Sequence, residues 1–318
     1  MKLKELFNFF IEQGIAADPR GAETARLALE TEKKKFAALT TVEKEDFDTG
    51  RLTNPYLDSR ILNGSGEENV NSVLVGIDIE TAEIMLAHAL KERGRKVDLV
   101  LTHHPEGHAY ATFYEVIGMQ ADILHRQGVP INIAESLVES RRTEVGRKVL
   151  PQNHARAVDA AKLLELPFMS AHTVADNQVV NYLQNTFDTR APKRLEDIMA
   201  ILNEMPEYRH AKKNGAGPRI IAGDKESRTG KIFVDMTGGT EGPREAIEKL
   251  AAAGVGTIVG MHMSEDHYKE AKKYHLNVVI AGHISSDNVG VNLLLDATEK
   301  KSGAIEVIEC SGFRRFKR

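Results

Sequence analysis

The sequence has one cysteine, no long apolar run and no large excess of charge of either sign. The lone Cys310 cannot form a disulfide within the chain and is more typical of a small packed side chain than of a nucleophile. No segment approaches the ~18 uncharged apolar residues of a membrane-spanning helix. Glu5 and Glu12 interrupt the N-terminal segment, unlike a signal peptide. We therefore expect a cytoplasmic protein with no membrane partner.

The charge balance and the length further narrow the class of protein. Forty-two basic and 46 acidic residues give a net charge of −4, which provides no general attraction to nucleic acid. The 318 residues, of which 42% are hydrophobic, exceed the size at which one core usually stops growing. The composition thus indicates an α/β protein of one large or two smaller domains, without nucleic acid as a partner.

The pattern of apolar residues predicts two related α/β halves with layered sheets and helices. Strands at 73–77 and 97–101, joined by a helix at 81–93, form a right-handed crossover. Further strands are expected at 129–133, 232–236, 256–260 and 277–281. We divide the chain into an N-terminal helical segment and loop (1–70), a first α/β half (71–187) and a second (188–318).

Two histidines mark the end of the second predicted strand. The run VDLVLTHHP places His103 and His104 directly after it, where open α/β sheets usually position ligands. Neutral imidazoles are common ligands of divalent metals, although one ring could instead cap the strand while the other faces water. His172 and Asp176 likewise follow a short apolar stretch, where a helix cap is the alternative reading.

A weak internal duplication connects these residues to the second half. The segments beginning at Ser72 and Gly256 share the order strand, helix, strand and histidine, so that His103 corresponds to His283. His103, His104 and Asp176 in the first half and His283 and Asp287 in the second would then face one pocket. Three imidazoles and two carboxylates suffice for two divalent ions, and a carboxylate can bridge them. Nitrogen and oxygen ligands without thiolate suit zinc, iron or manganese.

The sequence also resembles the Nif-three-like (NGG-one-interacting factor) family, many of whose members are described as GTP cyclohydrolase type-two-like. The resemblance extends from about Val73 to the C-terminus and rests on six short motifs in the family's order. They lie at 76–81, 98–105, 172–176, 238–242, 260–267 and 282–287. The family's last metal ligand is glutamate, whereas Asp287 is one methylene shorter.

The resemblance implies both a site and an activity. It assigns His103, His104, Asp176 and His283 as metal ligands in a dinuclear hydrolase that activates water for attack on a nucleotide-like or other small substrate. It also implies a homo-oligomer, with a ring-like hexamer as the expected form. His267 is our candidate for the catalytic acid or base, with a surface or supporting histidine as the alternative.

Two questions stay open at this point. The turn TGGTEGP (237–243) could bind phosphate through backbone N–H groups, but it lacks the Rossmann and Walker spacings and reads more readily as a structural turn. The chain as a whole could be an enzyme or a metal-binding scaffold or protein-interaction factor without turnover. An open coordination position favours the enzyme.

Overall fold

The computed structural model describes residues 1–318 and contains two separate β-sheets. The first sheet has the strand order β1-β4-β3-β2-β9, in which only β1 is antiparallel to its neighbour. Its strands are β1 (Arg60–Asn63), β2 (Ser72–Gly76), β3 (Leu99–Thr102), β4 (Phe168–Ser170) and β9 (Glu306–Glu309).

The second sheet has the order β5-β8-β7-β6, with β5 antiparallel to β8. Its strands are β5 (Arg219–Ala222), β6 (Lys231–Asp235), β7 (Val255–Gly260) and β8 (Asn277–Ile280). The mostly parallel strands of both sheets confirm the predicted fold class of two α/β halves. A parallel sheet needs cover on both faces, which explains why strands β2, β3 and β7 are buried and rich in aliphatic residues.

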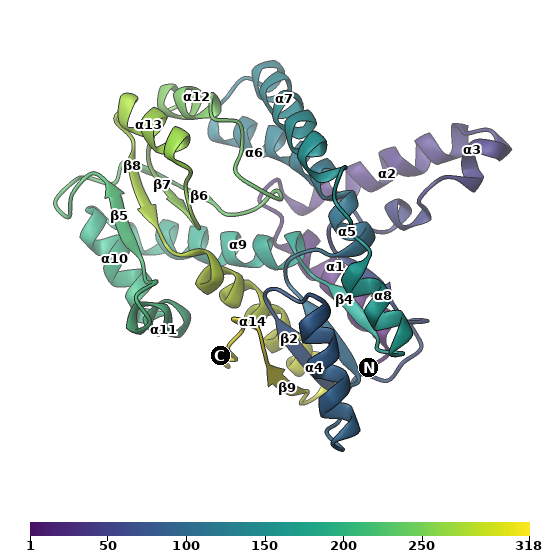
Figure 1. Ribbon diagram of the computed structural model, residues 1–318. Coiled ribbons are helices and arrows are strands. Elements are labelled where there is room, and N and C mark those ends of the chain that lie inside the picture. Colours follow the sequence, from purple (N-terminus) through teal and green to yellow (C-terminus); the bar gives the residue numbers. More distant parts are fainter.

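Two long helices lie between the sheets, as Figure 1 shows: α9 (Thr173–Arg190) and α14 (His283–Ser302). Residues near the start of α9, such as Val174, join the core of the first sheet, whereas Val179 and Leu183 join that of the second. Because both helices are buried over most of their surface, neither has the one-sided apolar pattern of a surface helix.

The remaining helices cover the outer faces and the N-terminal side. Helices α4 and α8 pack on the first sheet, α6, α7, α12 and α13 on the second, and α10 and α11 lie near α14. Their bounds are α4 (Thr81–Glu92), α5 (Gly107–Ala111), η2 (Phe113–Met119), α6 (Gln120–Gln127), α7 (Ile131–Val149), α8 (Arg156–Leu163), α10 (Leu195–Glu204), α11 (Pro206–Lys213), α12 (Ala246–Ala252) and α13 (Glu265–Lys273). None of the helices combines the length and apolar character that crossing a membrane requires.

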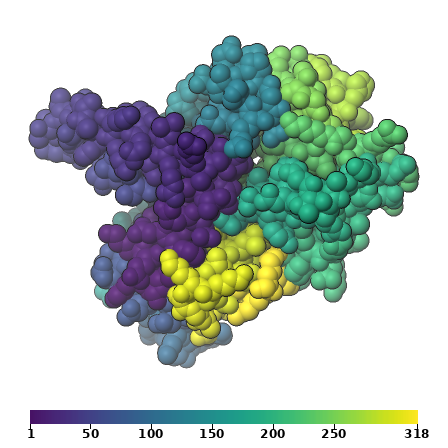
Figure 2. All heavy atoms as spheres, turned by 180° about the vertical axis from the view of Figure 1, so that it is seen from behind, coloured from purple at the N-terminus to yellow at the C-terminus, as the bar shows by residue number.

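The N-terminal helices differ in how they pack. Helix α1 (Leu3–Ala16) contacts α9 and α14, whereas α2 (Ala22–Ala38) and α3 (Thr41–Glu45) form an arm that projects from the body. A short helical turn, η1 (Thr49–Leu52), leads the chain back to β1. Viewed from behind in Figure 2, the purple N-terminal residues lie against the yellow C-terminal ones.

The prediction of a strand at 129–133 is wrong. Val129 is buried, but Pro130 is the cap of α7, and the chain is helical from Ile131 onward. Proline is well suited to the start of a helix because it has no N–H to satisfy there. The division at residues 70 and 187 stays a prediction; β1 before the first boundary and β9 after the second both pair within the first sheet.

Candidate metal centre

The predicted ligands come together from three chain segments. His103 and His104 follow β3, and their N–H groups donate to the carbonyl oxygens of Gly76 (3.0 Å) and Ile77 (2.9 Å) at the end of β2. Asp176 lies in the first turn of α9. His283 begins α14, and Asp287 lies one turn later. The strand ends and two helix starts thus meet at one place between the sheets.

The ring of His103 is fixed and buried. Its Nδ1 lies 3.1 Å from the carbonyl oxygen of Ala171, which identifies Nδ1 as the donor. Burial lowers the pKa of His103 to about 4, so the ring is neutral at neutral pH. Its Nε2 therefore carries a lone pair, and that atom lies 3.4 Å from both Asp176 Oδ1 and Asp287 Oδ1.

These three facing atoms, together with Asp287 Oδ2, have no hydrogen-bond partner although all four are buried. Buried polar side-chain atoms nearly always have a partner, and leaving one unsatisfied costs about 1–3 kcal/mol. A lone pair facing carboxylate oxygens has no proton with which to bond them. A cation is the group that satisfies all four atoms at once.

His104 forms the second part of the cluster. Its Nδ1 lies 2.6 Å from Asp78 Oδ1, which fixes the ring, and its Nε2 lies 3.4 Å from His283 Nε2. Asp287 Oδ2 lies 3.6 Å from the Nε2 atoms of both His104 and His283. Asp287 therefore directs Oδ1 toward His103 and Oδ2 toward His104 and His283, as a carboxylate that bridges two metal ions would.

The same arrangement defines two triads that could each hold a metal ion. One consists of His103, Asp176 and Asp287, and the other of His104, His283 and Asp287; within each, the ligand atoms lie within 4.8 Å of one another. A third such group joins His103 and His104 to His172. The shorter Asp287 side chain thus still reaches both sets of donors.

The spacing of the two helices depends on a glycine. Gly290, one turn beyond Asp287, packs so closely on the backbone of Ala175 that any side chain there would collide with the Ala175 carbonyl. Ala175 is adjacent to Asp176. The close contact of α14 with α9 therefore sets the separation of the two carboxylates.

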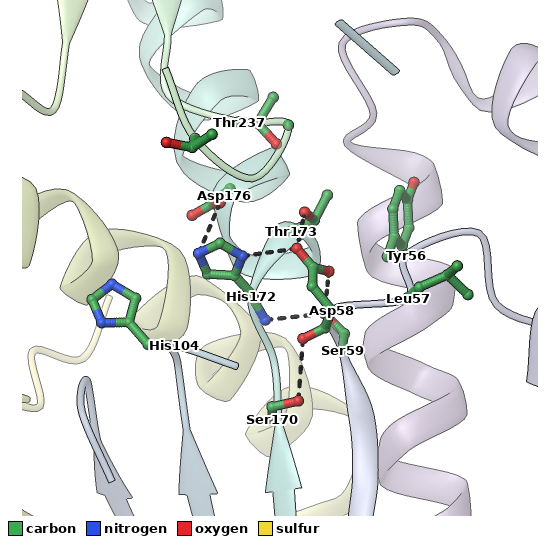
Figure 3. Close-up of polar contacts among 12 residues, drawn as sticks. Tyr56, Leu57, Asp58, Ser59, His104, Ser170, His172, Thr173, Asp176 and Thr237 are labelled. Atoms are coloured by element: carbon green, nitrogen blue, oxygen red, sulfur yellow. Dashed lines mark hydrogen bonds and ion pairs between the residues drawn. The ribbon is translucent and has the colours of Figure 1, made fainter. Parts of the chain in front are cut away.

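Sequence reasoning named His172 but missed its partner, Asp58. His172 Nδ1 lies 2.8 Å from Asp58 Oδ2, and Thr173 Oγ1 donates to the same oxygen at 2.6 Å. Figure 3 shows the His172 ring between Asp58 and Asp176. Although burial opposes the charged form, Asp176 and Asp58 raise the pKa of His172 to about 9 in the metal-free protein. Asp58 lies in an irregular segment before β1, so no periodicity or spacing indicated it.

His267, the predicted catalytic group, lies near the cluster but outside it. It lines the same pocket as His103, Asp176 and Asp287. Its Nδ1 lies 2.7 Å from Ser264 Oγ and its Nε2 lies 2.9 Å from the carbonyl oxygen of Gly242. Because both ring nitrogens have partners, a proton-transfer role requires one of these bonds to open, and that role stays a prediction.

His262 and Glu241 complete the rim of the pocket. The ring of His262 lies 4.9 Å from that of His283, between centroids, and its Nδ1 lies 3.4 Å from Glu241 Oε1. Glu241 also accepts from the N–H of Ser264 at 2.6 Å. A larger cleft of about 1130 Å³, lined by residues of α6, α9 and β6, contains none of the predicted site residues. All of the predicted site residues except His104 line the smaller pocket instead.

Known structures share this architecture. A NIF3 superfamily protein from Sphaerobacter thermophilus matches with a TM-score of 0.69 and 28% sequence identity, over 80% of this chain and 91% of that one. The resemblance to the Nif-three-like family is confirmed. No protein-family model and no curated protein matches this NIF3-like chain.

Two further structures match at lower similarity. Reduced HcgD from Methanocaldococcus jannaschii is 15% identical over 79% of this chain and 87% of its own, with a TM-score of 0.49. Protein SA1388 from Staphylococcus aureus is 12% identical over 82% and 91%, with a TM-score of 0.45. At this level neither structure bears on the site of the NIF3-like chain.

Proposed function

We propose that this chain is a metal-dependent hydrolase with a dinuclear centre. The observation that carries the proposal is the convergence of four buried, unpartnered acceptor atoms from His103, Asp176 and Asp287. Their nitrogen and oxygen character suits zinc, iron or manganese. His103, Asp176 and Asp287 would hold one ion, and His104 and His283 would hold the second with Asp287 as the bridge.

The chain's own residues prepare the site for this chemistry. Ala171 and Asp78 fix the tautomers of His103 and His104 so that each Nε2 points into the cluster. His283 is 41% exposed at its side chain, so the cluster is open toward the pocket. When bound, divalent ions would supply Lewis acidity, lowering the pKa of water and polarising a substrate oxygen.

The substrate class and the assembly belong to the same proposal. The family resemblance supports a small, nucleotide-like substrate and GTP cyclohydrolase-like hydrolysis. It also supports a homo-oligomer, with the ring-like hexamer as its expected form. His267 is the proposed acid or base, adjacent to the turn that borders the pocket.

The test begins with metal stoichiometry. Protein purified without chelator is analysed for metal content beside His103→Ala and Asp287→Ala, with His88→Ala as a histidine control outside the site. We expect about two ions per chain in the wild type and the control, falling to one or none in the site variants. A normal metal load in both site variants contradicts the assignment.

Turnover is the second step. The metal-loaded wild type is assayed for hydrolysis of nucleotides and phosphate esters, with Asp287→Ala as the inactive reference. Hydrolysis that disappears with the metal supports the enzyme. A full metal load without turnover of any compound would favour a metal-binding scaffold.

A further inference from the structure

The turn between β6 and α12 has an unusual set of unused donors. None of the six backbone N–H groups from Thr237 to Gly242 donates a hydrogen bond within the chain. Thr237 and Gly238 are buried and the other four residues are only partly exposed. Buried backbone N–H groups are almost always paired. The unpaired N–H groups of buried Thr237 and Gly238, followed by four more in partly exposed residues, therefore indicate a place where a ligand supplies the acceptors.

Four carbonyl groups of this turn, in contrast, have hydrogen-bond partners. The side chain of buried Gln120 donates through Nε2 to the carbonyl oxygens of Gly238 (2.8 Å) and Thr240 (2.7 Å). Thr237 Oγ1 donates to Asn177 Oδ1 (2.7 Å). These bonds hold the turn against α6 through its carbonyl oxygens and against α9 through the side chain of Thr237. Its N–H groups stay available.

The backbone of the turn has the geometry of an anion cradle. Gly238 and Gly239 have φ values of +91° and +88°, which other residues rarely adopt. Successive N–H groups around left-handed residues form a concavity that binds anions. A Cβ at Gly238 would lie 2.7 Å from Gln120 Cγ, so the close contact with the anchor also requires glycine.

The turn and the candidate metal centre line the same pocket. Thr237 and residues 239–242 line it together with His103, Asp176, His283 and Asp287. Figure 3 shows Thr237 on the loop that passes over Asp176. The carboxylate of Glu241, which would repel an anion, is held by the N–H of Ser264 and lies near the rings of His262 and His267.

We infer that the turn 237–242 binds the phosphoryl group of the substrate, which makes the substrate a phosphate ester or nucleotide. This inference rests on the proposed function, because the metal centre would hold the reacting end of the same molecule. The backbone N–H groups would bind phosphate oxygens, and Gln120 would act as the positioning residue of the turn.

Inorganic phosphate is the probe for the test. Its binding is measured by calorimetry or ³¹P line broadening, with metal-loaded and chelator-treated protein in parallel. Thr240→Pro removes one N–H group, whereas the matched control Thr240→Ser keeps it. Gln120→Met keeps the size of the anchor but removes its two donated bonds, and it serves as the second variant where Thr240→Pro loses its circular dichroism spectrum.

We expect the wild type and Thr240→Ser to bind phosphate equally, and Thr240→Pro and Gln120→Met to bind at least tenfold more weakly with unchanged metal content. The dependence on the turn should persist in chelator-treated protein, at lower affinity. Equal binding by all folded variants, or no binding by the wild type in either state, would overturn the inference. Loss of the metal centre alone would leave this turn-dependent binding in place. The experiment therefore distinguishes failure of the proposed function from failure of the phosphate site.

Discussion

Replacing Asp176 with asparagine should have opposite effects on the metal-free and metal-loaded protein. Asp176 is 4% exposed, and its Oδ1 has no hydrogen-bond partner. Burial raises the pKa of this carboxyl well above its ordinary value, despite the opposing effect of His172. The folded metal-free chain therefore bears a cost for the charged side chain, which an uncharged asparagine of the same shape avoids.

The magnitude follows from the unsatisfied buried group. We expect the substitution to raise the free energy of unfolding of the metal-free protein by about 1–3 kcal/mol. The folded state binds the Asp176 proton more tightly than the unfolded state, where the pKa is about 3.9, so wild-type stability falls as the pH rises through the raised value. The gain in Asp176→Asn should therefore be largest at alkaline pH and vanish below about pH 4.

We expect metal to reverse the order of stability of the two proteins. At a free metal concentration about 100 times the dissociation constant, binding stabilises the wild type by about 2.7 kcal/mol, a contribution that a variant lacking a ligand loses. The assay is urea denaturation of both proteins, with chelator and with zinc, beside Asp188→Asn, an exposed carboxylate of the same helix. A variant that is less stable than wild type in chelator would refute the reasoning, because Asp176 would then make a net favourable interaction without metal.

Three further predictions concern residues around the centre and the N-terminal loop. Asp78→Ala should weaken metal binding by about 10–100-fold in a chelator competition, because it frees the His104 ring; unchanged affinity would contradict this role. His267→Gln should lower kcat for the substrate found by screening by about 10²–10⁴-fold with normal metal content, whereas an effect on KM alone would count against proton transfer. Arg60 lowers the pKa of Asp48 to about 2 although burial opposes this, so the pair stabilises the fold above about pH 4 and this contribution is lost as the pH falls through 2. Asp48→Asn should reduce stability at neutral pH by less than about 1 kcal/mol and flatten the acid limb of a pH–denaturation curve; parallel acid limbs would exclude the pair as its cause.

The strands and histidines of the core could be predicted because their signals are local. A continuous apolar run followed by His103 and His104 indicates both a buried strand and the place where it ends. The repetition of this pattern before His283 suggested that two strand ends face each other, and the structure brings these histidines together. Asp176 followed from its position after a short apolar segment, which is strand β4 in the structure, and it lies in the first turn of α9.

The supporting residues could not be predicted in the same way, because their positions depend on tertiary contacts. Asp58 lies in an irregular loop and reaches His172 only once β1 pairs with β4. Strand β1 itself is short and partly exposed, so its residues show no alternation that would separate it from the preceding loop. Likewise, the sequence of the turn 237–243 gave no indication of which N–H groups would stay unpaired.

The position of β9 has a consequence for the order of folding during synthesis. This strand pairs with β2, some 230 residues earlier in the sequence, along the edge of the first sheet. The whole second sheet is thus enclosed between segments of the first, and α14, which carries His283 and Asp287, immediately precedes the closing strand. A ribosome must release nearly the entire chain before the first sheet can close. The histidines that follow β3 therefore meet His283 and Asp287, the other residues of the proposed metal site, only among the last steps of folding.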